Sequence, residues 1–200
     1  MEEWVVQAMQ RWPDVPALFG WLALDRRGRW LIRGEPISRL QIIDTINRNY
    51  ASDEYGRWFF QNGPQRGYVQ LASAPFVLRP LANDRLETHT GLRVERPTTA
   101  YLDEQGSLVA LTEHGPGEIA GDSLDWVLRR LRYRGWPITE QQLGEALSVE
   151  SGASTALTLL LDSVHVPIMR LDFAAAPTAL GFVRDPQPRD DERVATSEQD

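Results

Sequence analysis

The chain has 200 residues, of which 42% are hydrophobic and 24% charged, a composition typical of a folded globular protein. It contains no cysteine, so thiol catalysis, disulfides and cysteine-based metal sites are excluded. All 21 basic residues are arginine, which excludes a Schiff-base or P-loop lysine, and the net charge of -7 argues against binding to nucleic acid.

The chain begins with a predicted amphipathic helix. Apolar side chains between Glu3 and Trp12 recur at helical spacing, and Pro13 is placed to end the helix. No stretch reaches the ~20 apolar residues that a membrane helix requires, and the acidic Met-Glu-Glu start differs from a signal peptide. We therefore expect a cytoplasmic protein that does not enter the membrane.

Two predicted hairpins share the turn pattern Leu-Asp-x-x-Gly. In the first hairpin, the turn 25–28 connects the predicted strands 17–24 and 29–32. In the second, the turn 103–106 connects the predicted strands 98–102 and 107–111. The segments 22–35 and 100–113 can be aligned with each other. This alignment has two explanations that the residues leave open, a duplicated hairpin–helix–strand unit or favourable turn chemistry used twice.

Three further helices are predicted along the chain. The first follows the capping-box spacing Ser38-x-x-Gln41, and the third follows Thr139-x-x-Gln142. The second begins at Asp122 and is ended by Gly135. The remaining predicted strands are 57–61, 68–72, 74–78, 155–161, 164–171 and 180–183. The side chains expected in the core are Trp21, Trp30, Ile43, Ile46, Leu128 and Leu131.

These elements predict an α+β fold in which antiparallel β-hairpins pack with three or four short helices. We expect a first half over residues 1–92 and a second, similar half over residues 93–184. Residues 185–200 are rich in charge and poor in apolar side chains, which predicts a disordered acidic tail.

Several strings of residues resemble an uncharacterised family of proteobacterial proteins. They are Trp12-Pro13-x-x-Pro16, Gly20-Trp21-Leu22-x-Leu24-Asp25-x-x-Gly28-x-Trp30, Arg48-Asn49-Tyr50, Trp58-Phe59-Phe60-Gln61-Asn62-Gly63-Pro64-Gln65-Arg66 and His89-Thr90-Gly91. The hairpin followed by Gly34-Glu35-Pro36-Ile37-Ser38 is similar to a second family of unknown function, which implies repeated structural motifs and a signalling role. Neither resemblance implies catalytic residues.

The turn near Asn62 is the best candidate for a ligand-binding site. Amide groups beside a guanidinium can hold a polar or anionic ligand, and an aromatic wall would complete the site. The alternative is a tight turn whose polar residues are only solvated. The candidate side chains are Trp58, Gln61, Asn62, Gln65, Arg66 and His89.

His89 is the best candidate for a proton-transfer group because carboxylates lie near it in sequence. An enzyme of unrecognised class acting near Arg66 and His89 is therefore one alternative function. A second is a nucleic-acid adaptor using the arginine cluster 129–134, although such arginines also stabilise the end of a helix.

We expect a binding or regulatory module for a small ligand or a protein partner. The sequence indicates no catalytic motif, no cofactor and no metal site.

Overall fold

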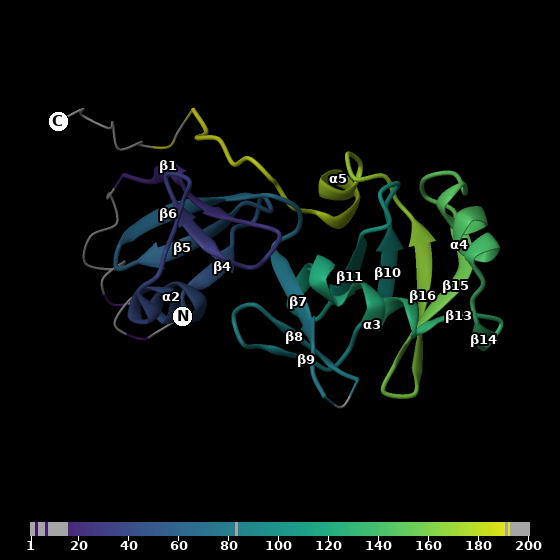
Figure 1. Ribbon diagram of the computed structural model, residues 1–200. Coiled ribbons are helices and arrows are strands. Elements are labelled where there is room, and N and C mark those ends of the chain that lie inside the picture. Colours follow the sequence, from purple (N-terminus) through teal and green to yellow (C-terminus); the bar gives the residue numbers. More distant parts are fainter. Residues whose placement is uncertain (1–2, 4–6, 8–15, 83, 191, 193–200) are drawn as a thin grey trace. The chain divides into compact units, whose positions relative to one another are not determined.

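The computed structural model describes residues 3, 7, 16–82, 84–190 and 192 (Figure 1). The predicted helix between Glu3 and Trp12 therefore lies almost entirely outside the described residues. The chain forms two compact units. The first unit comprises Met1–Asp25, Arg29–Ser73 and Gly181–Asp200, and the second comprises Arg26–Gly28 and Ala74–Leu180.

The first unit contains a sheet of six strands. Their order is β3-β2-β1-β6-β5-β4, and β1 pairs in parallel with β6 while the other neighbours are antiparallel. One helix, α2 (Leu40–Arg48), lies between β3 and β4 in the chain. The strands are β1 (Leu18–Leu24), β2 (Trp30–Ile32), β3 (Glu35–Pro36), β4 (Tyr50–Ser52), β5 (Trp58–Asn62) and β6 (Gln65–Leu71).

The second unit contains a sheet of ten strands, in the order β14-β13-β15-β16-β10-β11-β12-β7-β8-β9. The strands are β7 (Phe76–Pro80), β8 (Leu86–Thr88), β9 (Arg93–Val94), β10 (Thr99–Leu102), β11 (Leu108–Thr112), β12 (Gly115–Ile119), β13 (Leu131–Tyr133), β14 (Trp136–Pro137), β15 (Ser154–Leu161) and β16 (Val164–Arg170). The helices are a 3-10 turn (Gly121–Ser123), α3 (Leu124–Leu128), α4 (Glu140–Leu147) and α5 (Ala176–Leu180).

The fold is α+β, with short helices beside the two sheets. The prediction of antiparallel pairing holds within the hairpins but is wrong for the sheets, which are mixed. Strand β1 pairs in parallel with β6, β10 with β16, and β7 with β12. Each parallel pair joins strands that are distant in sequence, so no local turn signal could reveal it.

The two sheets share an order of five strands. In the first unit β3-β2-β1-β6-β5 are neighbours, and in the second β12-β11-β10-β16-β15 are neighbours in the same sense. In sequence, both motifs begin with a predicted hairpin around an Asp-x-x-Gly turn, β1–β2 or β10–β11. The first strand of each hairpin pairs in parallel with a strand that follows much later in the chain, β1 with β6 and β10 with β16.

The boundary between the units differs from the predicted one at residue 92. Strand β7 belongs to the second unit because it pairs with β12 and with β8, so the change of unit comes after Ser73. The described part of the predicted tail, residues 185–190 and 192, belongs to the first unit and contacts it. Disorder over residues 185–200 stays a prediction.

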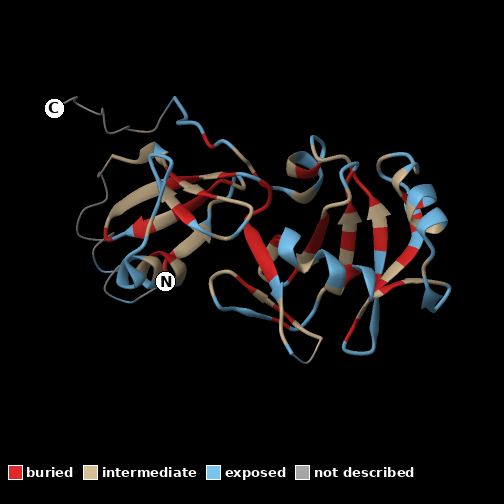
Figure 2. Cartoon of the chain, in the orientation of Figure 1, coloured by how far each residue is buried: buried red, intermediate tan, exposed pale blue. Residues whose placement is uncertain are grey.

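Buried residues are concentrated on the strands of each unit (Figure 2). Trp30, Ile46 and Leu131 are buried as predicted, and Trp21 and Ile43 are half-buried. Leu128 is 41% exposed, which contradicts its assignment to the core.

Two predicted elements differ from the structure. The helix expected from Asp122 to Gly135 ends at Leu128, because the chain there enters β13 and Leu131 pairs with Leu159 of β15. The strand expected over 180–183 is absent. The chain instead forms α5, which ends at Leu180. None of the helices in the described ranges is long and apolar enough to cross a membrane.

Candidate functional site

An apolar hollow lies between α2 and the strands of the first unit. Its empty volume is about 590 Å³, open solvent at its mouth included. Two isoleucines at the hollow, Ile32 and Ile42, are 44% and 39% exposed, so apolar surface reaches the solvent there. The lining residues are Leu18, Trp21, Leu22, Ile32, Ile42, Ile46, Phe60, Asn62, Gln65 and Gly67. The apolar lining with a few polar groups is typical of a small-ligand pocket.

Strand alternation decides which predicted residues reach this hollow. Asn62 pairs with Gln65 across the β5–β6 hairpin, and both line the hollow. Gln61 pairs with Arg66, and successive side chains of a strand point to opposite faces. Gln61 and Arg66 therefore lie on the other face of the sheet.

Asn62 and Gln65 supply the polar end of the hollow. The Asn62 side chain is exposed and makes no hydrogen bond within the described part of the chain. The Gln65 amide nitrogen donates to the Pro16 carbonyl over 3.1 Å. No charged side chain lines the hollow among the residues described, so its polar groups are neutral carboxamides.

Gly67 keeps the hollow open. A Cβ atom built at this position would meet nothing nearer than the Phe60 carbonyl oxygen, at 3.9 Å. A larger side chain would therefore extend into the space rather than clash with the backbone.

Gln61 and Arg66 make contacts with each other and with neighbouring groups of the protein, and their role in binding a ligand stays a prediction. The Arg66 guanidinium lies over the Phe59 ring at 4.5 Å, and its Nε donates to Gln61 Oε1 over 3.2 Å. The buried Gln61 amide in turn donates to the Gly63 carbonyl over 2.9 Å. These contacts stabilise the turn near Asn62, which the sequence indicates as a candidate ligand-binding site.

Trp58 is buried, with its ring 4.9 Å from the ring of Tyr50. It is not among the residues that line the hollow. The aromatic wall predicted from Trp58 is supplied by Trp21 and Phe60.

His89 belongs to the second unit, whereas Arg66 belongs to the first. Its Nδ1 accepts a hydrogen bond from the Val77 backbone N–H over 3.2 Å, and the backbone N–H of His89 donates to the Val77 carbonyl over 2.7 Å. Burial lowers the pKa of His89 to about 3, with a smaller contribution from the charge of Arg79. The imidazole is therefore neutral at physiological pH and supports the backbone beside β7. A site shared by Arg66 and His89 stays a prediction.

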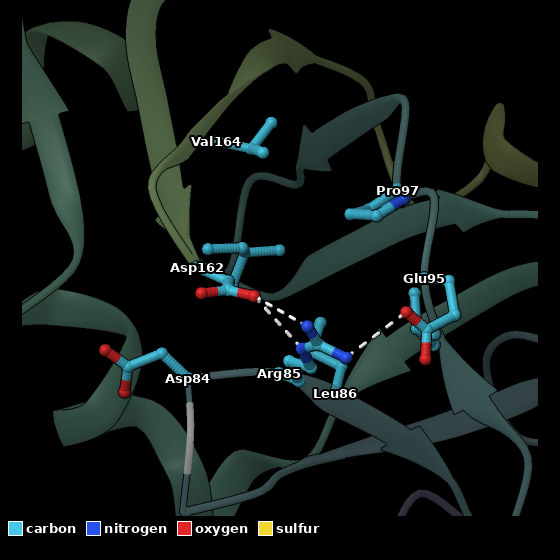
Figure 3. Close-up of a pocket in the computed structure, with 9 residues that line it drawn as sticks. Asp84, Arg85, Leu86, Glu95, Pro97, Asp162 and Val164 are labelled. Carbon is cyan, nitrogen blue, oxygen red and sulfur yellow. Dashed lines mark hydrogen bonds and ion pairs between the residues drawn. The ribbon is translucent and has the colours of Figure 1, made fainter.

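The second unit has a charged hollow of about 430 Å³, open solvent included (Figure 3). Arg85 lies between Asp162, at 3.0 Å, and Glu95, at 3.3 Å, while Asp84 pairs with Arg130. The described residues contain no cluster of three or more ligands able to hold a metal ion.

The arginine cluster 129–134 is also paired within the chain. Arg129 forms an ion pair with Asp125 over 2.7 Å, and Arg132 donates to two backbone carbonyls. Arg130 lies over the Trp126 ring and pairs with Asp84. The expectation that this cluster does not bind nucleic acid stays a prediction.

Sequence reasoning missed the apolar part of the hollow. Ile42 and Ile46 are four residues apart and therefore share one face of α2, but of this pair only Ile46 is among the side chains predicted from the sequence, and only for the core. Trp21 was likewise assigned to the core, although it is half-buried beside open space.

Comparisons with solved structures show the fold alone. A DUF1285 family protein from Silicibacter pomeroyi DSS-3 matches with a TM-score of 0.50 and 15% identity, over 78% of this chain and 85% of that chain. A DUF1285 family protein from Shewanella baltica OS155 matches with a TM-score of 0.41 and 14% identity, over 55% of this chain and 87% of that chain. No curated protein matches this chain.

A family model covers nearly the whole chain. Residues 1–187 match DUF2944, whose description is "Protein of unknown function (DUF2946)". The resemblance to an uncharacterised family is thereby confirmed, and the chain belongs to DUF2944, a family of unknown function.

Proposed function

We propose that the first unit is a binding module for a small, neutral and mainly apolar molecule with one polar end. The observation that supports this proposal is the hollow between α2 and the sheet, whose apolar walls lead to two carboxamides. Small-ligand sites commonly combine an apolar wall with a few convergent polar groups.

The charge of the ligand follows from the lining. Burying a charged group away from a partner is costly, and the described lining offers no side chain of opposite charge. The carboxamides of Asn62 and Gln65 can both donate and accept hydrogen bonds. An amide or hydroxyl end therefore fits the hollow better than a carboxylate or an ammonium group.

Two further proposals accompany this one. A duplicated hairpin–helix–strand unit would account for the strand order that both sheets share. A regulatory role in the cytoplasm is consistent with a sequence that has no cysteine to oxidise.

Isoleucine methyl groups provide a direct test. Ile32, Ile42 and Ile46 line the hollow, whereas Ile119 and Ile168 are buried in the second unit. With ¹³C-labelled isoleucine δ1-methyl groups, titration with octanamide should shift the first three signals and leave the other two in place. Octanoate and octylammonium should cause smaller shifts at equal concentration. Equal shifts in both units, or none at saturating octanamide, would contradict the proposal.

Filling the hollow tests where the ligand binds, and the same substitution in the second unit is the control. Gly67→Leu should abolish the octanamide-induced shifts because the new side chain occupies the open space. Gly144→Leu places the same side chain on α4 of the second unit, where a Cβ atom meets nothing within 4 Å. That variant should bind octanamide like the wild type. Binding that survives Gly67→Leu would place the ligand elsewhere.

A further inference from the structure

A buried guanidinium lies on the sheet face opposite the hollow. Arg57 is 5% exposed, and its Nε donates to Asp53 Oδ2 over 2.8 Å. Its NH2 group donates to the Tyr68 hydroxyl, which donates in turn to Asp53. Tyr68 pairs with Phe59, one residue away from the Gly67–Phe60 pair that lines the hollow, so it lies on the other face. We call Arg57, Asp53 and Tyr68 the arginine cradle.

The cradle is built by local sequence. Asp53 Oδ1 accepts hydrogen bonds from the backbone N–H groups of Tyr55 and Arg57, over 3.0 and 2.9 Å. These bonds fix the Asp53–Gly56 turn, where Gly56 has a φ of +75°. The inner edge of the guanidinium is therefore held by residues within the turn and by β6.

The outer edge of the guanidinium is held by the C-terminal segment of the same chain. The two terminal nitrogens of Arg57 donate to the two carboxylate oxygens of Glu192, over 2.8 and 2.5 Å. One of them also donates to the Gln187 carbonyl over 3.1 Å. Bidentate pairing of this kind is strong and directional, and it lowers the pKa of the Glu192 carboxyl.

Further contacts place this segment over the first unit. Gln70 donates to Asp185 over 2.8 Å, and the Arg189 guanidinium lies over the exposed Tyr55 ring at 3.9 Å. The Arg189 backbone N–H donates to Glu192, so a short turn presents the carboxylate to the cradle. Glu192 lies beyond the family match, which ends at residue 187, whereas all three cradle residues lie within it.

We propose that the arginine cradle is a binding site for an acidic peptide segment, and that Glu192 of the chain's own C-terminal segment occupies it in the closed state. The ligand chemistry follows from the contacts of the segment. A glutamate side chain fills the bidentate fork of Arg57, and a backbone carbonyl five residues earlier accepts the third hydrogen bond.

The exchange of one acidic peptide for another fits this geometry. Without Glu192, the Arg57 guanidinium keeps its hydrogen bond to Asp53, and its two terminal nitrogens can donate to the carboxylate of another peptide in the same bidentate way. A tethered segment acts at an effective concentration on the order of millimolar, so it excludes weak free peptides. A partner must therefore displace Glu192 with additional contacts, or bind when the segment is released.

A peptide added to the full-length chain tests this proposal. The probe is a fluorescein-labelled synthetic peptide with the sequence of residues 185–200, followed by fluorescence anisotropy. The Glu192→Gln chain should bind this peptide at least about tenfold more tightly than the wild-type chain, because its own segment no longer competes as a carboxylate. A probe peptide that itself carries E192Q should bind the same chain at least about tenfold more weakly.

A matched charge change serves as the control. Asp190→Asn also removes one negative charge from the segment, but the Asp190 side chain is exposed and makes no contact with the cradle. Its chain should bind the probe as weakly as the wild type does. The proposal is overturned if Glu192→Gln binds no better than Asp190→Asn, or if both probe peptides bind equally. Neither result depends on a variant of Arg57, whose replacement could unfold the unit.

Discussion

The two units use one order of strands to carry different side chains. Each contains a buried arginine that is 5% exposed, Arg57 in the first unit and Arg170 in the second. The carboxylate partners of Arg57 are themselves largely buried, with Asp53 at 8% and Glu192 at 24% side-chain exposure. Those of Arg170, Glu104 and Asp172, are 43% and 49% exposed.

The two arginines also differ in their backbone partners. Arg170 donates to the carbonyls of Leu102 and Leu147, and thereby ties its strand to neighbouring backbone. Arg57 receives a distant carboxylate in a protected fork. Strand order therefore does not determine function here, because the chemistry depends on which side chains the strands present.

Two helix residues that were expected in the core, one in each unit, differ in burial. Ile46 of α2 is 2% exposed and borders the hollow, whereas Leu128 of α3 is 41% exposed. Ile46→Ala should lower the free energy of unfolding of the first unit by about 2–5 kcal/mol, because it removes buried methyl groups beside existing space. Leu128→Ala should cost less than about 1 kcal/mol. Urea unfolding curves of both variants measure these costs.

A comparable cost for the two variants would mean that α3 is covered in solution. A cost below about half a kcal/mol for Ile46→Ala would mean that α2 does not pack as described.

Acid should destabilise the second unit through His89, which lies in that unit. The folded-state pKa of His89 is lowered to about 3, below its unfolded value of about 6.5. The unfolded state therefore binds more protons between these values, and stability falls as pH falls through this window. By pH 4.5 the loss from His89 is on the order of 2–3 kcal/mol.

Hydrogen exchange at pH 7 and pH 4.5 locates this loss. Backbone amides of β7 and β8 should lose protection at pH 4.5 in the wild type. His89→Asn should reduce the loss, because its Oδ1 can accept from the Val77 N–H without gaining a proton. If His89→Asn and the wild type lose protection equally, His89 is not the group that titrates.

Sequence alone predicts the local parts of this fold. The Asp25–Gly28 and Asp103–Gly106 hairpins form as expected, because an aspartate that accepts backbone N–H groups specifies a turn within a few residues. The β15–β16 hairpin also forms with its turn at Asp162 and Ser163.

Distant pairing was not predictable in the same way. The parallel pairing of β1 with β6 joins residues such as Leu24 and Leu71, which are far apart in the sequence, and nothing local marks it. Leu131 continues a helical pattern in sequence, yet its pairing with Leu159 places it in a strand. Arg57 was not singled out because its partner Glu192 lies 135 residues away in a segment predicted to be disordered.

One motif occurs in both units, and in each it leads into a predicted capping box. Arg33-Gly34-x-Pro36-Ile37-Ser38 and Arg134-Gly135-x-Pro137-Ile138-Thr139 have the same turn, with φ near +50° at both arginines and near +85° at both glycines. Each turn joins a two-strand pair, β2–β3 or β13–β14, and leads to a helix. Only the second helix has the predicted capping box.

The two helix starts give the smallest and most closely matched prediction. Thr139 Oγ1 accepts from the Gln142 backbone N–H, and the Gln142 side chain accepts from the Thr139 N–H, over 3.3 and 3.0 Å. Helix α2 instead begins after Arg39, with no side-chain cap. Thr139→Ala should therefore cost about 1 kcal/mol of unfolding free energy, while Ser38→Ala should cost less than about 0.3 kcal/mol. Thermal or urea unfolding of the two variants compares them directly. Equal costs would show that Ser38 caps α2 in solution, and that the matching sequence motifs produce matching helix starts after all.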